Sequence, residues 1–302
     1  MDNNLKVSVI IPAFNESLSI RGLVTKIRTL YPDFEIVVIN DGSSDNTAEV
    51  AAEAGATVFS HPYNIGNGAA IKSGIREATG EILVFIDGDA QHSPEDIGKL
   101  VKCFPKYDMV VGERSGNGHA TLFRAMGNFV FNRMASYVSK FRVKDLTSGF
   151  RAVKATIAYQ TLHLLPNTYS YPTTMTLCVL RSGYSVKYVP VEIKKRRKGK
   201  SGIKIINDGV RFFMIIIKIC TLFSPMRIFL PVSSIMFFLG LFNYAISYLI
   251  KNRFTNMSML LLISSLVIFM MGLVSEQICQ MRYERVRKDL LLVQPDKSYK
   301  DN

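Results

Sequence analysis

The stretch Ile82-Leu83-Val84-Phe85-Ile86-Asp87-Gly88-Asp89-Ala90-Gln91 joins a run of apolar residues to a short acidic segment. The apolar run is typical of a buried strand. Alternate residues of an extended segment point the same way, so Asp87, Asp89 and Gln91 can present three oxygen atoms to one hard cation, Mg²⁺ or Mn²⁺. Taken alone, the acidic segment fits a solvated turn better than a metal site.

Strands and helices are expected to alternate on both sides of this stretch. The pattern predicts strands at 6–11, 34–39, 57–60, 81–86 and 109–112, and helices at 17–30, 45–54, 66–78 and 93–104. Such alternation is typical of βαβ units on a mostly parallel sheet, which is the α/β fold class. Parallel sheets bind ligands at the carboxyl ends of their strands.

Two further polar clusters follow predicted strands. Pro12-Ala13-Phe14-Asn15-Glu16 follows the first strand, where Phe14 can stack on a base and Glu16 can accept a hydrogen bond. Asn40-Asp41-Gly42-Ser43-Ser44-Asp45 follows the second, where Asp41 can accept from a base or a ribose hydroxyl. A loop that leads into a helix and a turn built of turn-favouring residues remain the alternatives.

The chain of 302 residues carries a formal net charge of +13, from 37 Lys and Arg against 24 Asp and Glu. This excess indicates an anionic partner. Its densest part, residues 194–200, directly precedes an apolar region, which favours lipid headgroups over nucleic acid. The four cysteines form no CxxC pair and are interpreted as reduced thiols. The first residues show no cleavable signal pattern.

Residues 228–250 and 257–275 contain no charged side chain, and each is long enough to cross a bilayer. The short linker between them predicts a transmembrane hairpin, with a buried core helix as the alternative. Basic residues are denser outside the hairpin than in the linker, which predicts that both termini are cytoplasmic. Residues 203–223 are expected to form an amphipathic helix in the membrane interface.

Four motifs in order carry a resemblance to a known family: Ile10-Ile11-Pro12-Ala13-Phe14-Asn15-Glu16, the Asn40–Asp45 cluster, Asn64-Ile65-Gly66-Asn67-Gly68, and Asp87-Gly88-Asp89-Ala90-Gln91. The chain resembles the family 2 glycosyltransferases over about residues 5–205. The resemblance implies the GT-A (Rossmann-like) fold. It implies that Pro12, Phe14, Glu16 and Asp41 hold the nucleoside of a nucleotide-sugar, and that Asp87, Asp89 and Gln91 bind the metal and the donor diphosphate.

Further residues resemble one branch of that family, the dolichol-phosphate mannose synthases and their polyprenyl-phosphate relatives. Asp145-Leu146-Thr147-Ser148-Gly149-Phe150-Arg151 looks like the acceptor-side motif of that branch. Residues 196–201 are similar to its Arg-x-x-Gly-x-Ser segment, although Gly202 stands where a basic residue is usual. The residues that the resemblance assigns to the lipid phosphate are Arg114, Arg124, Asn128, Arg196 and Ser201.

The predicted reaction is the inverting, metal-dependent transfer of mannose from GDP-mannose to a polyprenyl phosphate. Because that acceptor is already an anion, no strong general base is needed, and guanidinium groups must instead hold two anionic groups together. The predicted catalytic residues are Asp89, Arg114, Arg124, Arg151 and Arg196. Three alternatives stay open: glucose or N-acetylglucosamine from a UDP-sugar, a hydroxyl acceptor, and a non-catalytic nucleotide-sugar-binding membrane protein.

These interpretations divide the chain into four parts. They are a cytoplasmic catalytic domain at 1–202, an interfacial region at 203–225, two transmembrane helices within 226–280 (about 228–250 and 257–278), and a basic cytoplasmic tail at 281–302. The expected location is the cell membrane or a membrane of the endoplasmic-reticulum type. The expected partners are the nucleotide-sugar, the polyprenyl phosphate and the bilayer, with no nucleic acid, and self-association through the transmembrane helices is left open.

Overall fold

The computed structural model describes residues 5–114, 132–133, 135–137, 139–168, 170–192, 221, 224–251, 253 and 255–293. The chain separates into two compact units, Met1–Ile203 and Lys204–Asn302, each of which is described by itself. The predicted interfacial helix at 203–223 lies almost wholly outside the described residues, as do residues 294–302 of the predicted basic tail.

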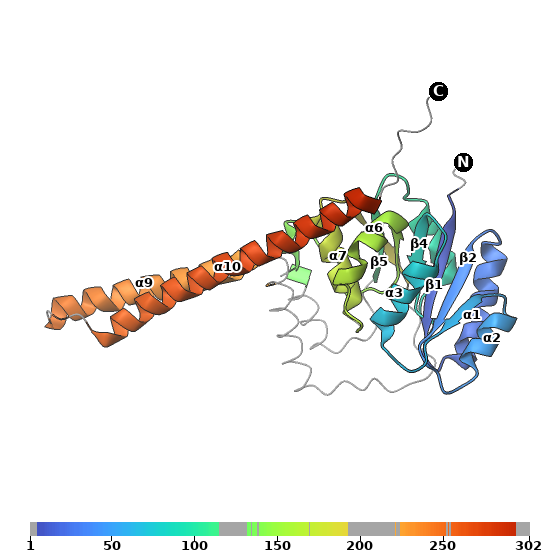
Figure 1. Ribbon diagram of the computed structural model, residues 1–302, viewed down its shortest axis with the longest axis horizontal. Helices are drawn as coiled ribbons and strands as arrows, with labels where there is room; N and C mark the ends of the chain where they lie inside the picture. The colour runs from blue at the N-terminus through green and yellow to red at the C-terminus, as the bar shows by residue number, and fades with distance from the viewer. Residues whose placement is uncertain are drawn as a thin grey trace, which may run out of the picture. The chain divides into compact units, whose positions relative to one another are not determined.

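The first unit is built on a seven-stranded sheet with the order β3-β2-β1-β4-β6-β5-β7. Figure 1 labels β1, β2, β4 and β5 of this sheet. The strands are β1 (Val7–Ala13), β2 (Glu35–Asn40), β3 (Thr57–Ser60), β4 (Ile82–Phe85), β5 (Met109–Arg114), β6 (Arg151–Lys154) and β7 (Val186–Val191). Of these, β6 alone runs antiparallel to both of its neighbours, β4 and β5. The sheet is therefore mostly parallel, as the sequence predicted.

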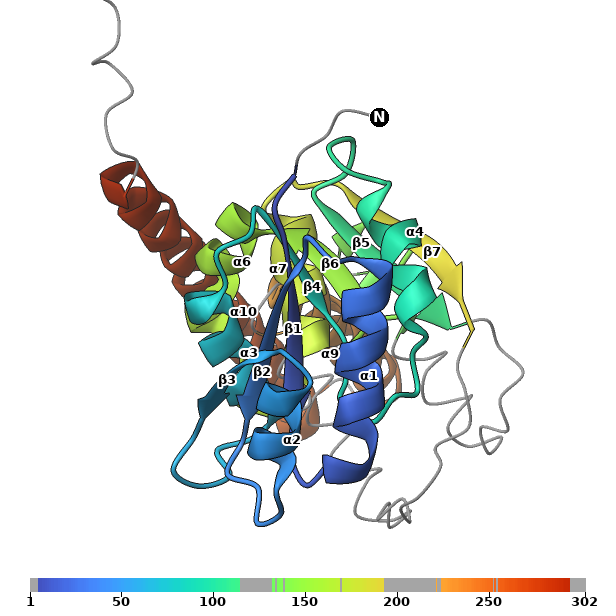
Figure 2. The same ribbon diagram turned by 90° about the vertical axis from the view of Figure 1, so that its right-hand side faces the viewer.

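Helices cover both faces of this sheet, and each face has its own apolar core (Figure 2). One face packs against α1 (Ser17–Leu30), α2 (Thr47–Glu53) and α4 (Ile97–Val101), the last preceded by the 3₁₀ turn η1 (Pro94–Asp96). The other packs against α3 (Asn67–Glu77), α6 (Ala155–Thr161) and α7 (Tyr171–Arg181), with the 3₁₀ turn η2 (Leu162–Leu164) after α6. A sheet covered on both sides needs strands that are apolar throughout, which explains the unbroken burial of β1 and β4.

The second unit contains two long helices, α9 (Met226–Lys251) and α10 (Asn256–Val293). The segments Met226–Ile250 and Asn256–Met281 are long and apolar enough to cross a membrane. The sequence predicted a second helix that ends near residue 278, but α10 continues to Val293. Loss of apolarity marks where a span ends, whereas a helix continues until a breaking residue appears, and residues 273–293 contain neither glycine nor proline.

Close contacts along their length join α9 and α10 into a hairpin (Figure 1). A Cβ atom at Gly272 would lie 2.6 Å from Cβ of Phe229, so only glycine allows the two helices to approach there. Near the tip, Asn243 Oδ1 accepts hydrogen bonds from Thr255 Oγ1 at 3.1 Å and from Ser258 Oγ at 2.8 Å. The structure thus contains the helical pair that the apolar pattern predicted.

Candidate functional site

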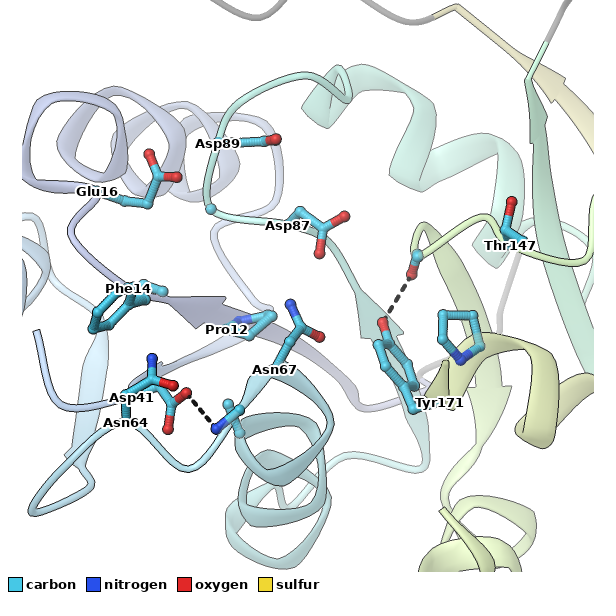
Figure 3. Close-up of a pocket in the computed structure, with 16 residues that line it drawn as sticks. Pro12, Phe14, Glu16, Asp41, Asn64, Asn67, Asp87, Asp89, Thr147 and Tyr171 are labelled. Carbon is cyan, nitrogen blue, oxygen red and sulfur yellow. Dashed lines mark hydrogen bonds between the residues drawn. The ribbon is translucent and has the colours of Figure 1, made fainter. Parts of the chain in front are cut away.

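A pocket of about 450 Å³ opens at the carboxyl edge of the sheet in the first unit (Figure 3). The ends of β1, β2 and β4, the start of α3, the loop that precedes β6, and the start of α7 surround it. Its lining residues are Pro12, Ala13, Phe14, Glu16, Asp41, Asn64, Gly66, Asn67, Ala70, Asp87, Gly88, Asp89, Thr147, Gly149, Tyr171 and Pro172.

Strand register explains why segments far apart in the sequence meet here. Ala13 pairs with Asn40 across the parallel β1 and β2, so the loops that follow both strands leave the sheet side by side. Phe85 pairs with Arg151 across the antiparallel β4 and β6. The residues after β4 therefore face the residues before β6, and the acidic segment meets the 145–149 loop.

Two carboxylates, Asp87 and Asp89, line the middle of the pocket (Figure 3). Burial and the charge of Asp89 raise the pKa of Asp87 from 3.8 to about 6, against the opposing effects of an Asn67 hydrogen bond and of Arg151 and Arg114. Two carboxylates whose charges repel each other in this way favour a cation beside them.

The third predicted metal ligand, Gln91, has its backbone N–H 3.1 Å from Asp89 Oδ1. Within the described ranges, no group of three or more His, Cys, Asp or Glu side chains gathers in a way that would hold a metal. Mg²⁺ is commonly held by one or two carboxylates together with substrate phosphates. The pair Asp87 and Asp89 fits that set of ligands. The role of Gln91 as a third metal ligand stays a prediction.

The loops after β1 and β2 form one end of the pocket. Phe14 is 45% exposed, and its ring lies free to stack on a planar group. Asn15, at a φ of 55°, locks the loops together: Asn15 Oδ1 accepts the Ser44 N–H at 2.9 Å, and the Asn15 N–H donates to Ser43 Oγ at 2.9 Å. Glu16 also lines the pocket and accepts a hydrogen bond from Ser19 Oγ at 2.8 Å.

Comparison with protein families identifies this arrangement. The family described as "Glycosyl transferase family 2" matches residues 8–162, a range that spans the pocket motifs from β1 to β6. The chain belongs to glycosyl transferase family 2. A second family, described as "GtrB C-terminal hairpin", matches residues 224–281 and so covers α9 and the apolar part of α10.

Individual relatives agree with this assignment. The chain is 31% identical over 201 residues to "Uncharacterized protein MJ1222" of Methanocaldococcus jannaschii, a match that covers 63% of this chain and 82% of that protein. Glucosyl-3-phosphoglycerate synthase of Mycobacterium tuberculosis, solved with Mn²⁺, UDP and glucosyl-3-phosphoglycerate, is similar with a TM-score of 0.58 at 19% identity, over 72% of this chain and 80% of that one. The same enzyme with Mg²⁺ and UDP gives 0.57 at 19% identity, over 72% and 79%. At such identity the likeness shows the fold, which is the GT-A fold expected from the motifs.

In this family 2 glycosyltransferase, Arg114 makes a two-pronged ion pair with Asp145. Arg114 Nε and Nη2 lie 2.7 and 2.9 Å from the two carboxylate oxygens, and Nη2 also donates to Thr147 Oγ1. Burial alone would raise the pKa of Asp145, but the hydrogen bonds and charge of Arg114 lower it below its ordinary value. Arg114 therefore fixes the start of the loop that carries Thr147 into the pocket.

Arg151, expected from the sequence to bind a phosphate, is fully buried, with 0% of its surface exposed. Its Nη1 donates to the Pro172 carbonyl at 2.7 Å and to Thr176 Oγ1 at 3.0 Å, and its Nε and Nη2 donate to the Ser148 carbonyl. These bonds tie the loop before β6 to α7. This placement favours a structural role for Arg151 over the direct phosphate contact that the motif suggested.

The pocket lining also includes residues to which sequence reasoning assigned no role. Tyr171, 2% exposed, has its hydroxyl 3.5 Å from the Gly149 carbonyl (Figure 3). The next residue, Pro172, also lines the pocket. Asn67 stood inside a quoted motif but had no assigned role. Its Oδ1 is buried and has no hydrogen-bond partner among the residues that the structure describes. No local sequence signal marks Tyr171, which enters the site only through the packing of α7.

Four of the predicted lipid-phosphate residues lie outside the described residues. They are Arg124, Asn128, Arg196 and Ser201. Their assignment rests on the motif resemblance alone.

Proposed function

We propose that this glycosyltransferase moves a sugar from a nucleotide-sugar to a polyprenyl phosphate at a membrane, with a divalent cation. The observation that carries the proposal is one pocket in which Asp87 and Asp89 stand between two different loops. The Phe14 and Asp41 end suits a nucleoside, and the Thr147 and Gly149 end leaves room for an acceptor. The family and the GT-A relatives solved with UDP and Mn²⁺ or Mg²⁺ support this division.

The membrane part of the proposal rests on the second unit. Two helices long enough to cross a bilayer match a named hairpin family. A polyprenyl chain stays in the hydrocarbon and offers only its phosphate to water, so an enzyme anchored by a hairpin meets this acceptor at headgroup depth. We place the catalytic unit and both termini on the cytoplasmic side, because basic residues are denser outside the hairpin than within its linker.

In the proposed reaction an oxygen of the lipid phosphate attacks the anomeric carbon. The new carbon–oxygen bond forms as the bond to the nucleoside diphosphate breaks, so the configuration is inverted and the diphosphate leaves with the electron pair. Asp87 and Asp89 would hold Mg²⁺ or Mn²⁺, which neutralises charge on the departing diphosphate. Holding both reactants in one pocket supplies proximity and orientation.

Mannose from GDP-mannose is the first donor to test, on the strength of the Asp145–Arg151 motif. Glucose and N-acetylglucosamine from UDP-sugars are the next. We assign the lipid phosphate to Arg114 together with Arg124, Asn128, Arg196 and Ser201. Arg114 is already paired with Asp145, so we expect a phosphate to contact the guanidinium edge that this pair leaves open.

The deciding experiment gives membranes that contain the protein a panel of labelled nucleotide-sugars with Mn²⁺ and either polyprenyl phosphate or an oligosaccharide. We expect label in the lipid fraction with one donor, and a loss of about a hundredfold or more in Asp89→Ala. Transfer to the oligosaccharide alone would refute the acceptor. Binding of a nucleotide-sugar without any transfer or hydrolysis would refute the proposal that the protein is an enzyme. Near-normal turnover by Asp89→Ala would refute the proposed metal site.

A further inference from the structure

A chain of hydrogen bonds runs behind the nucleoside end of the pocket. His61, in the loop after β3, lies between Asp41 and Ser73 of α3. Its Nδ1 is 2.7 Å from Asp41 Oδ1, and its Nε2 is 2.9 Å from Ser73 Oγ. Only 12% of the His61 side chain and 4% of the Asp41 side chain are exposed, so water competes weakly for these bonds.

The direction of these bonds follows from chemistry. An ionised carboxylate only accepts hydrogen bonds, so the proton between His61 and Asp41 belongs to Nδ1. In the tautomer that carries a proton on Nδ1 alone, Nε2 is an acceptor, and the Ser73 hydroxyl donates to it. Asp41 therefore fixes the tautomer of His61, and Ser73, at the other ring nitrogen, holds the orientation of the ring.

The two oxygens of Asp41 are not equally engaged. Oδ1 accepts from His61 and from the Ile65 N–H at 3.0 Å, whereas Oδ2 accepts from the Gly66 N–H at 2.8 Å. Each carboxylate oxygen can accept about two hydrogen bonds, so Oδ2 has capacity for one more donor. Asp41 is among the residues that line the pocket.

We propose that His61 and Ser73 are positioning residues that hold Asp41 so that Oδ2 accepts an N–H or O–H group of the nucleoside. This inference rests on the proposed function. The group that Asp41 meets must be a hydrogen-bond donor, because the carboxylate has nothing to donate. The nucleoside lies away from the bond that breaks, so its contacts with Asp41 stabilise the bound substrate and the transition state alike. We call the two hydrogen bonds that join Asp41, His61 and Ser73 the relay. Loss of the relay therefore raises KM for the nucleotide-sugar and leaves kcat nearly unchanged.

Substitutions at position 61 separate positioning from simple packing. In His61→Asn the amide nitrogen replaces Nδ1 and can still donate to Asp41. In His61→Gln the amide reaches the place of Nε2, beside Ser73, and the bond to Asp41 is lost. Ser73→Ala removes the hydroxyl that fixes the ring and leaves the space around it almost unchanged.

The test measures the Kd of GDP and of UDP, each with Mn²⁺, by calorimetry on the full chain in detergent, together with the melting temperature and the steady-state constants. We expect Kd for the bound nucleotide to rise about tenfold in His61→Gln and about threefold in Ser73→Ala, with His61→Asn close to wild type. The rises should appear in KM and not in kcat, with melting temperatures within a few degrees of wild type.

Several outcomes would overturn the relay. They are an unchanged Kd in His61→Gln and Ser73→Ala, a fall in kcat at constant Kd, or equal losses of binding and melting temperature in His61→Asn and His61→Gln. The last result would assign His61 to packing.

Asp41→Asn separates the two proposals. If it abolishes nucleotide binding while the His61 and Ser73 variants bind normally, the proposed function stands and the relay falls. If the wild type binds neither nucleotide, the proposed function fails and the relay with it.

Discussion

Gly149 packs directly against the carboxylate of Asp87: a Cβ atom at position 149 would lie 2.8 Å from Asp87 Oδ2. The two residues come from segments more than sixty positions apart, yet the pairing of β4 with β6 brings them together. The loop proposed to face the acceptor thus leaves no room for a methyl group beside the acid proposed to hold the cation.

Gly149→Ala should therefore damage catalysis more than folding. The added methyl group must displace the Asp87 carboxylate, and a displacement of about 1 Å in an active site can cost about a hundredfold in rate. The measurement is kcat/KM for sugar transfer beside a thermal melt. The matched control is Gly22→Ala on α1, where an added Cβ meets no atom within 4 Å. Equal activity in the two variants would contradict the prediction.

Metal affinity should fall as the pH falls through 6. The pKa of Asp87 is raised to about 6, so this acid is mostly ionised at pH 7 and mostly protonated at pH 5. A cation must displace that proton, and the apparent Kd for Mn²⁺ should rise about tenfold between pH 7 and pH 5. Calorimetric titration with Mn²⁺ at the two pH values measures this, and Asp87→Asn, which has no proton to displace, should remove most of the difference.

The same raised pKa carries a prediction for stability without metal. The native state holds this proton between the unfolded pKa near 4 and the folded pKa of about 6, so in that window stability falls as the pH rises. Above pH 6 the native state carries the full free-energy cost of burying the ionised Asp87 carboxylate. Asp87→Asn, which avoids that cost, should then be more stable than wild type. Denaturant titrations in the presence of a chelator at pH 4.5 and pH 7.5 check the sign. A wild type that gains on the variant as the pH rises would contradict it.

Arg151 should act on stability. Its replacement by alanine removes the buried guanidinium that donates to the Ser148 carbonyl, the Pro172 carbonyl and Thr176 Oγ1, and we expect a loss of about 2–4 kcal/mol in the free energy of unfolding. Arg21→Ala is the control, because Arg21 forms an exposed ion pair with Glu53 of the kind that contributes little. Thermal melts of both variants distinguish the two roles. A stable Arg151→Ala protein that has lost only phosphate binding would restore the direct role.

The hairpin should depend on Gly272. A larger side chain there meets Phe229, so Gly272→Leu should separate α9 from α10 and lower the melting temperature in detergent by several degrees. Leu266→Ala, on a side chain that is 61% exposed, should change it little. Equal melting temperatures for the two variants would mean that helix contact at Gly272 does not stabilise the hairpin.

The sequence was informative where a local pattern has a single physical meaning. Apolar runs bounded by polar clusters located β1 to β5, and the parallel arrangement of those strands placed Asp41 and Asp87 at one edge. The direction in which Arg151 points could not be predicted, because two of its hydrogen-bond acceptors come from α7, more than twenty residues further along the chain. Likewise, no sequence pattern near His61 predicts its hydrogen-bond partners, because Asp41 and Ser73 come close to it only through tertiary packing.

Because β6 runs against its two neighbours, the chain leaves the sheet after β5 and re-enters it at the same edge. The connection between Arg114 and Arg151 therefore has both of its ends at one edge of the sheet. Its length can change without disturbing a single strand pairing. The strands that position Asp41 and Asp87 can therefore be inherited unchanged while this connection varies.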